Sequence, residues 1–430
     1  MFKLKEHQTT PAVEITAGIT TFCAMVYVLA ANPAILAKAG GPPEALFTAT
    51  ALAAIAGSLI MALVANLPFS VAPGMGINAI FGFGIILTMG YSWPQAVAAV
   101  LIAGALFFLL SLSPLREKIL RDIPRSLQYA VCGGVGFLIA GIGLTGSEVV
   151  VLTSGLPALG NLHNPSVRLV LIGLFLTALM LAMNFRYAVL AGIILTTLIG
   201  IPLGVTQPPT GGGIFSLPPS PAPLLLNIDF SLIGTADFWG VVLVFLFMAI
   251  FDSLAGFLGL FSVMGEEDEK KYKPKMGRAF VADSLAMVVS GLLGISPNTA
   301  YGESGTGVAV GGRTGLTALV CAGGFVLALF CAPLFLAIPF AAVAPALMVV
   351  GWYMLSPLTR IDFKDATESF PAIMVVVLIA LSWKISDSLA VAWLAYLLMK
   401  GVSGRVRELN VTVCLVGLVF AAKLGWDMLA

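Results

Sequence analysis

The chain has 430 residues, of which 59% are hydrophobic and only 10% are charged. Soluble domains carry about 25% charged residues, so this composition cannot cover a soluble surface of such a size. Together with the net charge of +1, it excludes a nucleic-acid binder, a secreted disulfide scaffold and a disordered chain. We therefore expect a multi-pass protein of the cell membrane.

The first ten residues are polar, and the apolar run after them has no cleavage-like site, so the first span is expected to stay attached. The five cysteines lie inside apolar segments and are interpreted as small hydrophobic residues. A membrane-spanning helix needs about 20 apolar residues. The candidate spans are 13–34, 45–66, 93–112, 125–144, 166–183, 186–205, 237–262, 276–295, 314–336 and 338–356, with shorter ones at 369–383, 386–400 and 409–427.

Two further apolar stretches, 68–88 and 296–312, are interrupted by glycine and proline. If both cross the membrane and 409–427 is set aside, the chain has fourteen spans and a cytoplasmic N-terminus. Nearly all assigned basic residues then lie inside, as the positive-inside rule requires. Those left outside are Lys38, Arg168 and Lys384. Removing either broken span would reverse every later loop, whereas 409–427 could cross or lie in the interface.

The chain also contains an internal repeat. Ser70–Gly84 in the first broken stretch is matched by Ser296–Gly312, about 226 residues later. Because seven spans per half is an odd number, the second half must enter the membrane with the opposite orientation. Inverted repeats with paired broken segments are typical of transporters, whose site lies between those segments. The stretch 206–236 joins the halves, and the charged stretch 265–278 is expected to be a solvated cytoplasmic loop.

The broken stretches have a predictable local structure. Pro73, Gly74 and Gly76 forbid a continuous helix in the first, and the second repeats the pattern from Ser296 onward. We expect each to form a short extended strand followed by a half-helix that begins in mid-membrane. The free N–H groups at the start of each half-helix would then face a cavity, which suits anionic or acceptor-rich solutes.

Three carboxylates lie in predicted spans or broken stretches and away from their ends, where a charge needs a partner or a water-filled cavity. Asp252 lies midway along 237–262, and Glu303 lies in the second broken stretch. Beside the half-helix donors, Glu303 would accept two N–H groups of a planar heterocycle. The sequence leaves the role of Asp283 open. This residue either takes part in transport, or it caps a helix or links it to the 265–278 loop.

Other chemistry has little support in the sequence. His7 and His163 lie outside the spans, so neither a histidine proton relay nor a metal cluster is expected, and no resident cofactor. Gly141–Gly146 matches GxGxxG but ends a membrane helix, which favours close helix packing over dinucleotide binding. Without a Walker A, HExxH or nucleophile-elbow motif, we expect neither an enzyme nor an ATP-driven pump.

Four motifs together resemble the nucleobase–cation symporters of the xanthine/uracil permease superfamily, most closely the azaguanine-resistance-like branch. They are ANLPFSVAPGMGINAIF, FDSLAGFLG, YGESGTGVAVGGRTGLTA and FAAVAPALMVVG, and the resemblance runs from about Glu14 to Arg407. It implies an all-α transporter that imports a purine nucleobase (adenine, guanine, hypoxanthine or xanthine) by proton symport, with sodium as the less expected coupling ion. It also implies a homodimer and an elevator-like movement.

The resemblance divides the chain into a core domain, 13–112 and 237–336, and a gate domain, 123–205 and 338–401. The segment 409–427 is left as an extra. Position by position, Glu303 matches the carboxylate that holds the base, and Asp252 matches the acid tied to substrate and proton coupling. Residues of the broken segments complete the implied substrate site: Thr299, Tyr301, Gly302, Ser304, Asn78, Gly74 and Gly76.

Two departures leave the exact base open. The run Met248-Ala249-Ile250 lacks the second acid that usually precedes the Asp252 position, and Ala300-Tyr301-Gly302-Glu303 is nearer the uracil/xanthine pattern. An anion transporter of the related sulfate-permease architecture and a passive channel are the alternatives. Two carboxylates in the expected cavity argue against an anionic cargo, and the inverted repeat favours a carrier over a channel.

Elevator movement would need small residues where core and gate slide. The small residues of the fifth and twelfth spans are the candidates, with static helix packing as the other interpretation. They are Gly133, Gly134, Gly136, Ala140, Gly141, Ala342, Ala344, Ala346 and Gly351.

Overall fold

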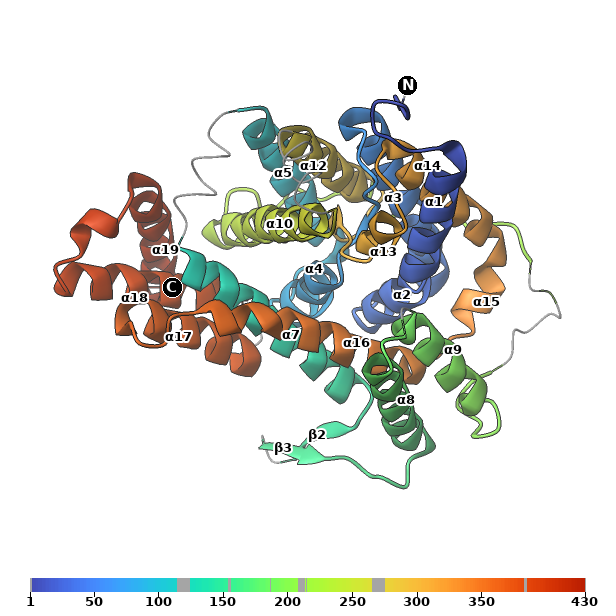
Figure 1. Ribbon diagram of the computed structural model, residues 1–430. Coiled ribbons are helices and arrows are strands. Elements are labelled where there is room, and N and C mark those ends of the chain that lie inside the picture. Colours follow the sequence, from blue (N-terminus) through green and yellow to red (C-terminus); the bar gives the residue numbers. More distant parts are fainter. Residues whose placement is uncertain are drawn as a thin grey trace.

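The computed structural model describes residues 2–113, 124–153, 156–185, 187–207, 213, 215–264, 275–382 and 385–429. Within these ranges the chain is mostly helical, with two short two-stranded sheets (Figure 1). Residues 265–274 of the charged stretch, part of the 206–236 connection and Lys384 lie outside the described residues.

The first half of the chain alternates long helices with one broken segment. Its elements are α1 (Pro11–Met25), α2 (Val28–Lys38), α3 (Pro43–Ile60), η1 (Met61–Ala65), β1 (Val71–Pro73), α4 (Met75–Ala79), η2 (Ile80–Thr88), α5 (Trp93–Leu112), α7 (Arg125–Gly146), β2 (Val150–Thr153), β3 (Leu156–Leu159), α8 (Pro165–Ala182) and α9 (Ala188–Gly200).

The second half follows the same plan. Its elements are α10 (Ala236–Val263), α12 (Met276–Leu292), β4 (Asn298–Ala300), α13 (Ser304–Ala309), α14 (Gly315–Ala328), η4 (Leu329–Cys331), α15 (Ala332–Leu336), α16 (Phe340–Leu355), η5 (Ser356–Arg360), α17 (Ala366–Ser382), α18 (Ile385–Val402), η6 (Val406–Glu408) and α19 (Val411–Leu429).

The expected structure of the broken segments is confirmed. Each consists of a three-residue strand followed by a short helix, β1 with α4 and β4 with α13. The strands pair antiparallel, with Val71 opposite Ala300 and Pro73 opposite Asn298. Because all six strand residues are buried, this small sheet brings residues far apart in sequence together inside the helix bundle.

Serine and asparagine side chains extend this pairing reciprocally. The Ser70 N–H donates to the Ser304 hydroxyl at 2.9 Å, and the Ser296 hydroxyl donates to the Asn78 amide oxygen. The strands are also held from outside the sheet in equivalent ways. The N–H of Val71 donates to the Ser58 hydroxyl of α3, and that of Asn298 to the Ser290 hydroxyl of α12, both at 3.1 Å.

The helices pack as two groups. In one group, α5 packs on α10 and α12, and α14 packs on α1 and α3. In the other, α7 packs on α16 and α17, α16 also contacts α8 and α9, and α18 packs on α17. Figure 1 shows α7 and α16 running side by side below the first group, with α8 and α9 at one end of the pair. The paired strands lie within the first group.

Length and composition support a membrane location. Among the described residues, eight helical stretches are long and apolar enough to cross a membrane, from Pro11–Lys38 to Phe340–Arg360. Three shorter apolar helices, Met75–Thr88, Ala188–Gly200 and Ala366–Ser382, add to these. The protein is therefore a multi-pass membrane protein.

Two of the small residues expected at a sliding surface lie at contacts between helices of one group. A Cβ atom on Gly136 of α7 would lie 2.6 Å from the carbonyl oxygen of Gly351 of α16, and Gly134 faces Ile379 of α17 in the same way at 2.9 Å. Their lack of a side chain lets helices of one group approach closely. For Gly134 and Gly136 these contacts support the static-packing interpretation, whereas a sliding surface at the other small residues stays a prediction.

Two elements were not expected in this form. The segment 409–427 forms α19, which packs on α18, and the Trp393 indole N–H donates to the carbonyl oxygen of Val413 at 3.0 Å. A hairpin of β2 and β3 lies between α7 and α8. Its strands are four residues long, too short for their pattern to stand out in a loop.

Candidate functional site

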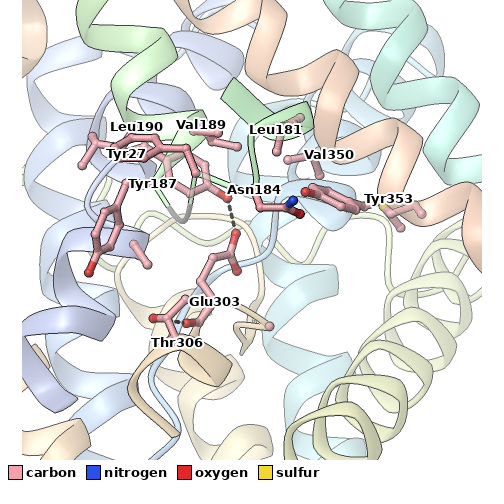
Figure 2. A pocket seen from close by; sticks show the side chains of 15 residues that line it. Tyr27, Leu181, Asn184, Tyr187, Val189, Leu190, Glu303, Thr306, Val350 and Tyr353 are labelled. Carbon is pink, nitrogen blue, oxygen red and sulfur yellow. Dashed lines mark hydrogen bonds between the residues drawn. The ribbon is translucent and has the colours of Figure 1, made fainter. Parts of the chain in front are cut away.

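Glu303 is held by a residue from the start of the chain. It follows β4 and immediately precedes α13, and the Tyr27 hydroxyl donates to its Oε1 atom at 2.7 Å. Tyr27 lies in the break between α1 and α2, where Leu29 and Ala30 donate their N–H groups only three residues back. Figure 2 shows the Tyr27 hydroxyl pointing at the carboxylate.

Tyr301 fixes the backbone on which Glu303 stands. Its N–H donates to the Ser70 carbonyl at 3.0 Å, and its hydroxyl donates to the Pro73 carbonyl at 2.6 Å. Both partners belong to the other broken segment, so the two segments are joined on each side of the Tyr301 residue. The phenol is buried and lies along the strands.

Two adjoining cavities meet at Glu303. The larger has a volume of about 690 Å³ and the smaller about 220 Å³. Both are lined by Tyr27, Gly302, Glu303, Val350 and Met354. The larger cavity also contacts Ala24, Leu181, Asn184, Phe185, Tyr187, Ala188, Val189, Leu190, Thr306 and Tyr353. The smaller also contacts Gly74, Met75, Gly76, Asp252, Gly256, Thr299, Ala300 and Tyr301.

The three glycines of the site differ in the space around their Cα atoms. A Cβ atom on Gly74 would lie 2.7 Å from the Thr299 side chain, so only glycine allows the two broken segments to approach here. A Cβ atom on Gly76 would lie 3.2 Å from Val135 of α7. At Gly302 a Cβ atom would meet nothing within 4 Å, so its backbone borders open cavity space.

Asp252 and Asp283 lie in neighbouring helices with different surroundings. Asp252 of α10 lines the smaller cavity together with Glu303. Asp283 of α12 is fully buried and accepts a hydrogen bond from the hydroxyl of Ser253, the residue after Asp252. Asp283 lines neither cavity. Its hydroxyl partner belongs to α10, and residues 265–274 of the charged loop lie outside the described residues.

The structure brings together most of the substrate residues expected from the sequence. Thr299, Tyr301, Gly302, Gly74 and Gly76 line the smaller cavity with Asp252 and Glu303. Asn78 and Ser304 line neither cavity. They are fully buried and pair with Ser296 and Ser70, so they join the broken segments to each other.

Several lining residues were not found from the sequence. Tyr27, Asn184 and Tyr187 carry no charge, so their placement in or beside a span is inexpensive and gives no signal. Glu14 was also missed as a buried carboxylate. It accepts from the N–H of Arg313 at 3.0 Å and the Thr317 hydroxyl at 2.6 Å, which fixes the start of α14 away from the cavities. Within the described residues no three of His, Cys, Asp or Glu are placed to hold a metal ion.

These features define a class: a multi-pass membrane protein in which two broken segments meet beside a cavity that contains carboxylates. The profile of the Permease family (xanthine/uracil permease) matches residues 12–391. The chain belongs to this family.

Two permeases are similar to this protein over almost the whole chain. The guanine/hypoxanthine permease PbuO of Bacillus subtilis is 39% identical, with 99% of each chain covered. The adenine permease AdeP of Escherichia coli is 38% identical, with 99% of this chain and 95% of that protein covered.

Solved structures share the fold. The transmembrane domain of the cyanobacterial bicarbonate transporter BicA is similar with a TM-score of 0.65 at 17% identity, covering 86% of this chain and 96% of that chain. SLC26A9 is similar with a TM-score of 0.62 at 11% identity, covering 90% of this chain and 66% of that one. At these identities the likeness concerns the fold alone.

Proposed function

We propose that this protein is a secondary active transporter that imports a purine nucleobase by proton symport. The names of the full-length relatives, guanine/hypoxanthine and adenine permeases, support the substrate class. The observation that carries the proposal is the Glu303 carboxylate, which has one oxygen on Tyr27 and borders both cavities.

Glu303 is the main substrate ligand in this proposal. Purines carry ring and exocyclic N–H donors, and a carboxylate is the strongest acceptor that a protein offers them. The uncharged walls, including Gly302, Val350 and Met354, fit the flat faces of the base. Tyr301, Asn78 and Ser304 hold the two broken segments in position and do not themselves need to touch the base.

Asp252 is the proposed coupling residue, since it faces the same small cavity as Glu303. A carboxylate deep in a membrane is costly to keep charged, so a proton taken up with the substrate would discharge the site for transit. We therefore take the proton as coupling ion, with sodium as the alternative.

The finer fold belongs to the same proposal. The fourteen spans are α1–α2, α3, β1–η2, α5, α7, α8 and α9 in the first half, and α10, α12, β4–α13, α14, α16, α17 and α18 in the second. The reciprocal hydrogen bonds of Ser70 with Ser304 and of Ser296 with Asn78 support an inverted repeat, because such a repeat makes each contact twice. The N-terminus is then cytoplasmic, and α19 is additional.

The two packing groups support a core and a gate domain with the site between them. Glu303 and Tyr27 come from the first group, and Leu181, Val350 and Met354 come from the second. Alternate exposure of a site between two groups follows if the core moves as a body against the gate, as an elevator. We also expect the protein to form a homodimer.

The alternative is transport of an anion, since BicA and SLC26A9 share the fold. Two carboxylates facing one small cavity would repel an anionic cargo, whereas they suit N–H donors. Uptake of bicarbonate without uptake of purines would favour this alternative.

Purified protein in proteoliposomes tests the proposal. We expect labelled adenine or hypoxanthine to accumulate when the outside is made acidic, and to equilibrate without accumulation when the gradient is collapsed. Glu303→Gln should lose at least about 2 kcal/mol of binding free energy, because the N–H groups of the base lose a charged acceptor. Glu44→Gln makes the same change at an exposed position of α3 and should transport like the wild type.

A further inference from the structure

The larger cavity has a second polar wall that faces Glu303. This wall comes from the α8–α9 connection and from α16, and its polar side chains are Asn184, Tyr187 and Tyr353. Figure 2 shows Asn184 and Tyr353 beside the Glu303 carboxylate, and Tyr187 on the Tyr27 side with its hydroxyl pointing away. The cavity has a volume of about 690 Å³, within the range of small-molecule sites, and Asn184 and Glu303 both line it.

Asn184 is held by its backbone, which leaves its side chain available. It lies just beyond the end of α8 with a φ of 55°, in the left-handed region that asparagine tolerates better than most residues. Its N–H donates to the Leu181 carbonyl at 2.9 Å, and the next N–H, of Phe185, donates to the Met180 carbonyl at 2.9 Å. Among the described residues, no group is hydrogen-bonded to the Asn184 side-chain amide.

The aromatic side chains of this wall cannot select between purines. Every base has flat faces, so a ring that stacks on one base stacks on another with similar strength. The Tyr187 and Tyr353 rings therefore fit any purine. A primary amide is different, since it presents one acceptor and one pair of donors side by side.

We propose that Asn184 is the specificity-determining residue, reading the 6-substituent and N7 of a purine whose other edge is bound by Glu303. This inference rests on the proposed nucleobase transport. The edge of adenine offers an N–H donor at position 6 and an acceptor at N7, which match the amide oxygen and amide N–H of asparagine in two hydrogen bonds. Guanine and hypoxanthine offer acceptors at both places, so the amide oxygen finds no donor. The site therefore favours a 6-aminopurine over a 6-oxopurine.

Two substitutions at this position keep the turn and change only the recognition. Asn184→Gly removes the amide, and glycine adopts the left-handed conformation without strain. Asn184→Asp keeps the shape and replaces the amide donors by acceptors, and aspartate also tolerates this conformation. Alanine would confuse a loss of contact with backbone strain.

Equilibrium binding of adenine and hypoxanthine to purified protein in nanodiscs separates the outcomes. We expect the wild type to bind adenine more tightly, and Asn184→Gly to lose about tenfold or more in adenine affinity, with a smaller loss for hypoxanthine. Asn184→Asp should weaken hypoxanthine at least about tenfold relative to adenine, because a carboxylate would face two acceptors. Asn164→Asp, at the other end of α8 and outside both cavities, is the matched control and should leave both affinities unchanged.

A wild-type preference for hypoxanthine, or an unchanged ratio of the two affinities in Asn184→Gly, would overturn this inference while leaving nucleobase binding intact. Equal losses for both bases in the two variants would also overturn the selecting role. If the wild type binds neither base, the proposed function itself fails. Melting temperatures close to the wild-type value establish that each variant is folded.

Discussion

At the scale of single residues, the site depends on a hydroxyl and a carboxylate that lie 276 positions apart in the sequence. The Tyr27 hydroxyl donates to Oε1 of Glu303 at the border of both cavities. It leaves the remaining lone pairs of the carboxylate for the N–H donors of a substrate. In the proposed site Tyr27 therefore positions Glu303, and its effect should reach the substrate through that carboxylate.

Tyr27→Phe removes this hydroxyl without changing the ring. Hydrogen bonds to charged groups are worth about 1.5–3 kcal/mol, so we expect purine affinity to fall by about tenfold to a hundredfold. Titration calorimetry measures the loss. Tyr91→Phe is the matched control, because the buried Tyr91 hydroxyl lacks a hydrogen-bond partner in the described part of the chain. Equal affinity in wild type and Tyr27→Phe would contradict the positioning role.

Asp252→Asn should separate binding from coupling. An amide cannot take up the proton, so we expect the variant to exchange labelled purine across the membrane yet fail to accumulate it along a proton gradient. Counterflow and gradient-driven uptake on the same proteoliposomes measure the two activities. Asp237→Asn, at the exposed end of the same helix, should retain both. Accumulation by Asp252→Asn would move the coupling role elsewhere, with buried Asp283 as the next candidate.

Glu303 and Asp252 could be found from the sequence because a charge in a span is costly and therefore conspicuous. Asn78 was predicted to contact the substrate, but it lines neither cavity and pairs with Ser296. Its position relative to the cavity depends on how the two broken segments cross, which the sequence does not show. Tyr27 and Asn184 could not be found, because neutral polar groups are common near spans. Their role follows only when α1, α8 and α13 are placed around one cavity.

At the scale of elements, proline and glycine made the two broken segments predictable, whereas their pairing was not. The register that sets Val71 opposite Ala300 depends on contacts from α3 and α12 that have no local sequence signal. The role of the small residues in α7 was open for the same reason. Spacing alone cannot tell whether a glycine stripe faces a fixed neighbour or a moving one.

Gly136→Trp tests the assignment to fixed packing. The new side chain would enter the contact of α7 with α16, where even a Cβ atom would lie 2.6 Å from the Gly351 carbonyl oxygen. Overpacking costs about 1–3 kcal/mol, so we expect melting temperature, purine affinity and transport to fall together. Gly323→Trp, in α14 with nothing near its Cβ position, should be tolerated. Loss of transport with normal stability and binding would restore the sliding interpretation.

At the scale of the whole molecule, the sequence could suggest how many times the chain crosses but not where α19 belongs. Its apolar residues pack on both groups of helices. Phe420 of α19 lies 6.4 Å from Phe247 of α10 and 5.9 Å from Trp393 of α18, measured between ring centroids. Phe247 and Trp393 also stack directly at 6.2 Å. This aromatic cluster therefore joins the proposed core to the proposed gate.

The cluster provides a direct test of elevator movement. If the core slides, α10 must move past α18 and α19, and a covalent link between α10 and α19 should arrest it. The test uses Phe247→Cys with Phe420→Cys in a background without the five native cysteines. When a short bifunctional thiol reagent cross-links this pair, we expect the protein to lose transport while still binding purine. The control pair is Leu397→Cys with Gly417→Cys, which links α18 to α19, whose residues already touch. This link should leave transport intact because both helices stay with the gate.

Both cross-links are quantified by mass spectrometry. When the reagent is a reducible one, reduction of the cross-link should restore transport in the Phe247–Phe420 pair. Undiminished transport by fully cross-linked Phe247–Phe420 protein would mean that α10 and α19 move together, and the boundary between core and gate would then lie between α18 and α19.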